Sequence, residues 1–221
     1  MTEGEKIILL KEKLSDKRSK RVVFISNCLI NENTRYLGGA FAKGIIDEVI
    51  DELKKKGIGI VQMPCPEQKA WGGVLKKKML RGYGINKSFI NNLLKIYINF
   101  FIWNTKRIYK KLAKDVVSQI KDYLDSGFEV AGIVGVKGSP SCGLSQALDM
   151  EKSADFVAGI DIEKLNRDNF NEQCYKNCLV GREGLFMEKI KDCLEKEGIN
   201  IKFIEYDLLA EIKGEKPKIE L

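Results

Sequence analysis

No histidine occurs anywhere in this chain of 221 residues. The absence excludes Ser-His-Asp and Cys-His catalysis, zinc sites built from imidazole, and any acid or base that relies on a histidine side chain. Chemistry in this protein must therefore use cysteine, carboxylate or hydroxyl groups, or a bound cofactor.

Motifs that bind phosphate are missing as well. No Gly-Lys pair precedes Ser or Thr, which excludes a P-loop, and no G-x-G-x-x-G sequence occurs. Cys28 and Arg35 follow the apolar run RVVFI, a context that is typical of a protein-tyrosine-phosphatase loop. However, six residues separate the two where that loop has five, and Tyr36 takes the place of its small hydroxyl residue. The Cys28 thiol therefore needs another explanation.

Long hydrophobic runs are also scarce. The N-terminal segment has a four-residue apolar run, Ile7 to Leu10, between charges and without a small-residue cleavage site, so we expect no secretory signal. Asparagines interrupt the apolar stretch near residue 100, so we expect no transmembrane segment. The chain is predicted to be cytoplasmic with its six cysteines reduced, which favours metal binding or catalysis over disulfides.

The residues that are present predict one α/β domain over residues 1–221. Apolar runs rich in Val and Ile alternate with segments of helical period, which predicts a Rossmann-like parallel sheet with helices on both faces. The predicted strands are Val22 to Ser26, Ile58 to Met63, Val130 to Val136, Phe156 to Ile160 and Ile201 to Tyr206. The predicted helices are Ala40 to Lys56, Thr105 to Asp125 and Gly184 to Lys196.

Three cysteines follow the ends of predicted strands. Cys28 and Cys65 each lie two residues beyond a strand, and Cys142 lies six residues beyond the next. Ligands of such sheets bind beyond the carboxyl ends of the strands, where these loops meet. Proline and glycine in Pro-Cys-Pro and Gly-Ser-Pro-Ser-Cys-Gly restrict the loops and allow close approach to a bound group. The alternative is three unrelated thiols in loops.

The other cysteines have simpler interpretations. Cys193 falls within the last predicted helix, where a buried cysteine acts as a small hydrophobic residue. Cys174 and Cys178 would share one face of a helix, but no third ligand lies near them in the sequence, so we expect a structural role.

The motifs CL…RY-x-GG, CPE and GSPSCG, in this order and at these strand ends, resemble the thiouracil desulfidase family, from about Arg21 to Tyr206. The resemblance implies an oxygen-sensitive [4Fe-4S] cluster bound by Cys28, Cys65 and Cys142, and non-redox removal of sulfur from a thiolated pyrimidine. The chain differs from the usual pattern at Thr34, where a second cysteine is common, at Leu37, where aspartate is common, and in a long basic segment after CPE.

The expected chemistry suits these residues. Three thiolates leave one iron of a cubane cluster open, and this iron can polarise a thiocarbonyl group for attack by water. Glu67 is the candidate proton acceptor, with a solvated loop carboxylate as the alternative. Ser139 and Ser141 could hydrogen-bond a pyrimidine edge or simply form the turn. Arg35 could bind an anion or form a salt bridge with Glu67 or Glu32.

Residues 68–114 form a basic, aromatic-rich insertion. They hold 12 Lys and Arg, no Asp or Glu, and eight of the 19 aromatic residues. This composition favours contact with RNA or an anionic surface, or else an amphipathic lid whose aromatics pack on the core. The second hypothesis is therefore a nucleic-acid-binding protein with a structural cluster or none. A fourth protein ligand from Cys174 or Cys178 would favour it.

Overall fold

The computed structural model describes residues 1–85, 91–212, 214–215 and 219, with only the backbone of 91–95 and 212. Phe89, one of the eight aromatic residues of the basic insertion, lies outside the described residues. The elements in chain order are α1 (Glu3–Lys13), β1 (Arg21–Ile25), α2 (Asn27–Ile30), η1 (Glu32–Thr34), α3 (Asp47–Lys55), β2 (Gly59–Gln62), α4 (Pro66–Ala70), α5 (Lys77–Leu80), α6 (Asn91–Asp125), β3 (Glu129–Val136), β4 (Ala147–Leu148), α7 (Met150–Ala158), η2 (Ile162–Lys164), α8 (Arg167–Cys178), β5 (Leu179–Val180), α9 (Leu185–Lys196), β6 (Phe203–Tyr206) and α10 (Leu208–Ile212).

The central sheet has four parallel strands in the order β2-β1-β3-β6. The register pairs Val23 of β1 with Ile60 of β2 on one side and with Gly132 of β3 on the other. Because all four strands run the same way, their carboxyl ends meet at one edge of the sheet. The predicted parallel α/β fold is confirmed.

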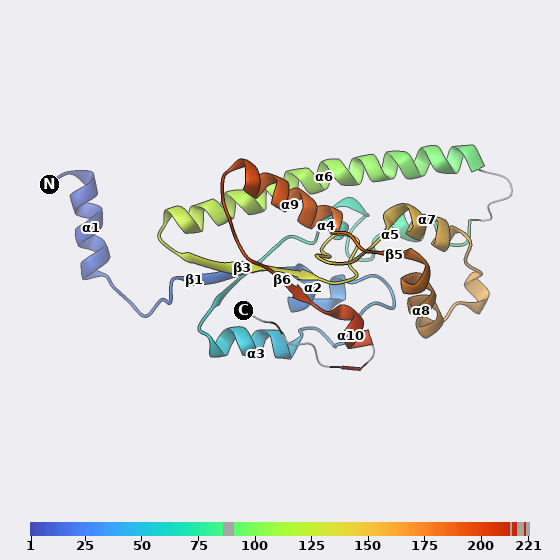
Figure 1. Cartoon of the computed structure of the whole chain (residues 1–221), viewed down its shortest axis with the longest axis horizontal. Coiled ribbons are helices and arrows are strands. Elements are labelled where there is room, and N and C mark those ends of the chain that lie inside the picture. Colours follow the sequence, from blue (N-terminus) through green and yellow to red (C-terminus); the bar gives the residue numbers. More distant parts are fainter. Residues whose placement is uncertain (86–90, 213, 216–218, 220–221) are drawn as a thin grey trace.

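Helices cover both faces of this sheet. Figure 1 shows α6 and α9 along one face and α3 and α10 along the other. The strands fit this double cover because β1 is buried from Val22 to Ile25 and β3 is buried over its last residues, as expected for a parallel sheet. α1 stands away from this body and has no buried residue (Figure 1).

One predicted strand is wrong. Phe156 to Ile160 belongs mainly to helix α7, which ends at Ala158 with Gly159 as its C-cap. The Asp149 side chain caps this helix by accepting a hydrogen bond from the Lys152 backbone N–H at 2.9 Å. A short apolar run does not distinguish a strand from a buried helix segment, and the helix cap decides the matter here.

The predicted starts of two helices also need correction, whereas the helix predicted from Gly184 to Lys196 agrees with α9 to within one residue. The helix expected from Ala40 begins only at Asp47, because the Glu32 carboxylate accepts hydrogen bonds from the backbone N–H groups of Phe41 and Ala42 and fixes a loop there. The helix expected from Thr105 is part of the longer α6, which begins at Asn91. The short antiparallel pair β4–β5 was not predicted.

The basic insertion, residues 68–114, contributes to both the interior and the surface. Trp71 and Tyr109 are buried, and the Trp71 Nε1 donates a hydrogen bond to Thr105 Oγ1 at 3.2 Å. Phe100 and Trp103 remain exposed on α6. Within the described residues, no helix is long and apolar enough to cross a membrane.

Candidate functional site

The structure brings the three loop cysteines together. Cys28, Cys65 and Cys142 line one pocket of about 50 Å³ at the carboxyl edge of the sheet. The other predicted site residues, Glu67, Ser139 and Ser141, also line this pocket. These six residues come from the three segments that follow β1, β2 and β3, which are far apart in the sequence.

Cys28 is positioned by the end of β1. The Ser26 backbone N–H and hydroxyl both donate to the carbonyl oxygen of Val134 on β3, at 3.0 and 2.8 Å. These bonds extend the sheet pairing by one residue before the chain turns into α2. Leu29 is fully buried beside Cys28 and anchors this short helix in the core. The thiol is thereby held at the sheet edge.

Cys65 is positioned by the start of α4. The chain leaves β2 through Met63, whose backbone N–H donates to the carbonyl oxygen of Ile25 at 2.9 Å. Cys65 occupies the N-cap position and Pro66 the first turn, where its fixed φ suits a helix. The Gln68 backbone N–H lies 3.4 Å from Cys65 Sγ and donates to it. This bond is the capping interaction, and it favours a charged or metal-bound sulfur.

Cys142 sits in a tight loop after β3. The Ser139 hydroxyl oxygen accepts hydrogen bonds from the backbone N–H groups of Ser141 at 3.3 Å and Cys142 at 3.0 Å. Gly184 packs against this loop, and a Cβ there would lie 2.5 Å from the carbonyl carbon of Ser141. The close approach explains why the chain has glycine at 184. Ser139 therefore forms the turn that presents Cys142.

Burial governs the protonation of the three thiols. It raises the pKa of Cys28, although the Arg35 guanidinium opposes the shift, and it raises the pKa of Cys65 to about 12. Burial also raises the pKa of Cys142 well above its usual range, and negative charge on Cys28 would raise it further. The thiols are therefore neutral unless a cation compensates their charge, which is what a bound metal centre would do.

Arg35 lies in a buried ionic network. Its Nη1 is 2.8 Å from Glu32 Oε1 and 3.1 Å from Glu211 Oε2 of α10. The predicted pairing with Glu32 is confirmed, whereas Glu67 has a different cation. No sequence motif indicated Glu211 as a partner of Arg35, because the two residues are 176 positions apart along the chain.

Glu67 is held by two partners. The Ser141 hydroxyl donates to its Oε1 at 2.8 Å, and Lys76 Nζ lies 3.3 Å from its Oε2. Lys76 is fully buried, adopts a left-handed backbone conformation with φ of 52°, and also donates to the Thr34 carbonyl oxygen at 2.5 Å. Although Lys76 belongs to the basic insertion, residues 68–114, it is not available to contact RNA phosphates, because its ammonium group faces Glu67 inside the protein.

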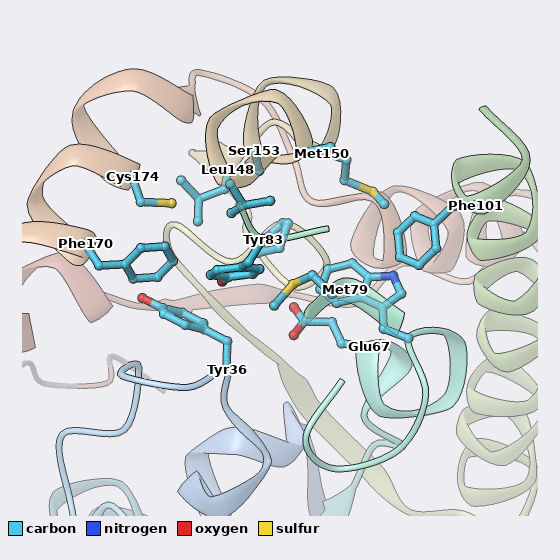
Figure 2. A pocket seen from close by; sticks show the side chains of 14 residues that line it. Tyr36, Glu67, Met79, Tyr83, Phe101, Leu148, Met150, Ser153, Phe170 and Cys174 are labelled. Atoms are coloured by element: carbon cyan, nitrogen blue, oxygen red, sulfur yellow. The ribbon is translucent and has the colours of Figure 1, made fainter. Parts of the chain in front are cut away.

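A second cavity adjoins the cysteine pocket and was not foreseen. We call it the aromatic chamber; its volume is about 100 Å³. Figure 2 shows Tyr36, Phe170 and Cys174 at one end, Phe101 at the other, and the Glu67 carboxylate pointing toward Met79 between them. The two cavities share Tyr36, Glu67, Pro140 and Leu148. The spacing of motifs along the sequence could not reveal this chamber, because its walls come from several separate segments that range from residue 36 to residue 174.

The remaining cysteines lie outside the cysteine pocket. Cys174 and Cys178 are buried in a small apolar cluster with Leu148, and burial raises the pKa of Cys174 to about 12. Cys193 packs against the main core from α9. All three positions agree with the structural role that we expected for them.

The three thiols of the pocket are the type of ligand that holds an iron–sulfur cluster. Across the described residues, no group of three Cys, Asp or Glu side chains is arranged to hold one metal ion. A cluster makes a different demand, because each thiolate binds a different iron and the sulfur atoms lie apart. The pocket offers three thiols, one of which has a backbone N–H donor and one of which lies beside a guanidinium group.

Comparison with known proteins adds little about function. No protein-family model matches the chain, and no solved structure matches it. A protein of Methanocaldococcus jannaschii that is described as uncharacterized is 23% identical over 149 residues, which are 67% of this chain and 82% of that protein. The function must therefore be inferred from the site.

Proposed function

We propose that the chain binds a [4Fe-4S] cluster through Cys28, Cys65 and Cys142 and hydrolyses the carbon–sulfur bond of a small thiocarbonyl compound, such as a thiolated pyrimidine. The observation that carries the proposal is the convergence of these three thiols on one pocket that also contains Glu67. The resemblance of the motifs around these residues to the thiouracil desulfidase family supports it.

The cluster would supply an iron that is open to a soft sulfur atom and polarises the carbon attached to it. The reaction itself is a hydrolysis: the oxygen of water forms a bond to that carbon, the carbon–sulfur bond breaks, and the sulfur leaves as hydrogen sulfide. No electron is gained or lost by the substrate. The proton that water loses needs an acceptor within the site.

Glu67 is the side chain that accepts this proton in the proposal. Its carboxylate lines both the cysteine pocket and the aromatic chamber, so it borders the space where a substrate would lie. The hydrogen bond from Ser141 and the ion pair with Lys76 fix its orientation. A base held by two partners needs little reorganisation before it acts.

Anaerobic reconstitution tests cluster binding. We expect about four irons and four sulfides per chain and a brown chromophore. Cys65→Ser should lose both, whereas the matched control Cys193→Ser should keep both, because Cys193 lies outside the pocket. Full iron loading of Cys65→Ser would contradict the proposal. Release of sulfide from 2-thiouracil by the loaded protein then tests the reaction.

A second candidate function is nucleic-acid binding by α6. Phe100 is 61% exposed and Trp103 57%, and the Arg107 guanidinium lies 5.7 Å from the Trp103 ring centroid. Exposed aromatic rings beside basic side chains suit base stacking combined with phosphate contact. Lys106, Lys110 and Lys111 are exposed on the same helix. This surface is separate from the cysteine pocket.

A further inference from the structure

The aromatic chamber lies next to the cysteine pocket and therefore bears on which substrates the site can hold. The two cavities share four lining residues, so a molecule bound at the thiols can extend directly into the chamber. Trp71, Met79, Tyr83 and Phe101 in its wall all belong to the basic insertion, residues 68–114. The insertion thus forms part of the wall of the space next to the site.

The chamber suits an uncharged, apolar group. Its wall consists mainly of aromatic and aliphatic side chains from the insertion, α7 and α8. Among the described side chains that line it, Glu67 is the only acidic or basic one, and its cation Lys76 is already engaged by that carboxylate. The exposed lysines of the insertion do not line the chamber. A phosphate or carboxylate would therefore enter without a partner, at a large desolvation cost.

The size of the chamber limits what it can hold. Its volume is about 100 Å³, whereas an engineered apolar cavity of about 150 Å³ in another protein binds benzene. A short alkyl chain or part of a small ring would fill the available space. A sugar phosphate is too large and too polar for it.

Resting on the function proposed above, we infer that the natural substrate is a neutral thiocarbonyl compound carrying a small apolar substituent, with the thiocarbonyl end at the three cysteines and the substituent in the aromatic chamber. A bare thiolated pyrimidine would leave the chamber unfilled. A thiolated nucleotide would place a charged group where the wall offers no cation.

Binding of oxygen analogues tests this inference without any turnover. The probes are uracil, 6-propyluracil and 6-carboxyuracil, and binding is followed by the change in tryptophan fluorescence. The full chain carries Trp103→Phe, so that Trp71 in the chamber wall is its only tryptophan. Each buried methylene group strengthens binding about fourfold. Because ordering the propyl chain offsets part of this gain, we expect 6-propyluracil to bind at least about 10-fold more tightly than uracil. The 6-carboxyuracil should bind no better than uracil.

Two variants locate the effect. Ala154 lines the chamber, so Ala154→Leu should fill the space and remove most of the preference for 6-propyluracil. Asp155→Leu, on the neighbouring exposed position of α7, should retain it. A thermal melt of each variant shows whether the fold is intact. A third variant, Phe101→Ala, enlarges the chamber and should shift the preference toward uracils with longer alkyl chains.

Two results would overturn the inference: equal binding of uracil and 6-propyluracil, or tighter binding of 6-carboxyuracil. Failure of the proposed reaction gives a different pattern. In that case thiolated substrates release no sulfide, while 6-propyluracil still binds in a manner that Ala154→Leu abolishes.

Discussion

The buried ion pair between Lys76 and Glu67 gives the sharpest structural prediction. Lys76 Nζ is 3.3 Å from Glu67 Oε2, and the two side chains are 0% and 12% exposed. Lys76→Met keeps most of the aliphatic stem but removes the ammonium group, leaving the carboxylate without its cation. Removing one partner of a buried pair costs about 3–5 kcal/mol. Because Glu67 keeps slight contact with solvent and the hydrogen bond from Ser141, we expect Lys76→Met to lower the free energy of unfolding by the lower value, about 3 kcal/mol.

The assay is urea unfolding followed by a thermal melt. For a chain of this length, a loss of about 3 kcal/mol corresponds to a fall of about 6–12 °C in Tm. Glu67→Gln should destabilise the fold similarly, because it leaves the Lys76 ammonium group buried without an anion. The double variant Lys76→Met/Glu67→Gln should lose only about 1 kcal/mol, since neither charge remains. The control Lys77→Met, at an exposed neighbouring position, should change stability by less than about 0.5 kcal/mol.

Additive effects of the two single substitutions would refute this reasoning, because independent losses mean that the two charges do not interact across the measured distance. A cost below about 1 kcal/mol for Lys76→Met would refute it too. That result would show that the ammonium group reaches water and that its burial is not maintained in solution.

The remaining predictions concern the proposed activities. In the cluster-loaded protein, Glu67→Gln should lower turnover by about 100-fold or more, while a thiolated substrate should still perturb the cluster absorption. The double variant Lys76→Met/Glu67→Gln controls for the loss of stability. Ordinary turnover in the single and the double variant would assign the proton to a group other than Glu67. RNA binding by α6 should weaken steeply from low to physiological salt, and it should also weaken on Trp103→Ala or Arg107→Ala. Salt-insensitive binding, or none at low salt, would remove this second function.

The sequence predicted the parallel sheet because its central strands β1 and β3 are largely buried and appear as apolar runs between helical segments. The predicted ranges for four strands agree with β1, β2, β3 and β6 to within two residues at each end. Phe156 to Ile160 failed because a short apolar run has no period that distinguishes strand from helix, and Asp149 and Gly159 set a helix there instead.

The sequence also predicted that three cysteine loops meet at one edge, because parallel strands place their carboxyl ends together. The partners of the charged groups depended on tertiary packing. Lys76 was grouped with surface lysines by its neighbours in the chain, yet the fold buries it against Glu67. Glu211 joins Arg35 from the opposite end of the sequence. The aromatic chamber arises in the same way, because its wall combines segments that only the folded arrangement of α4, α6, α7 and α8 brings together.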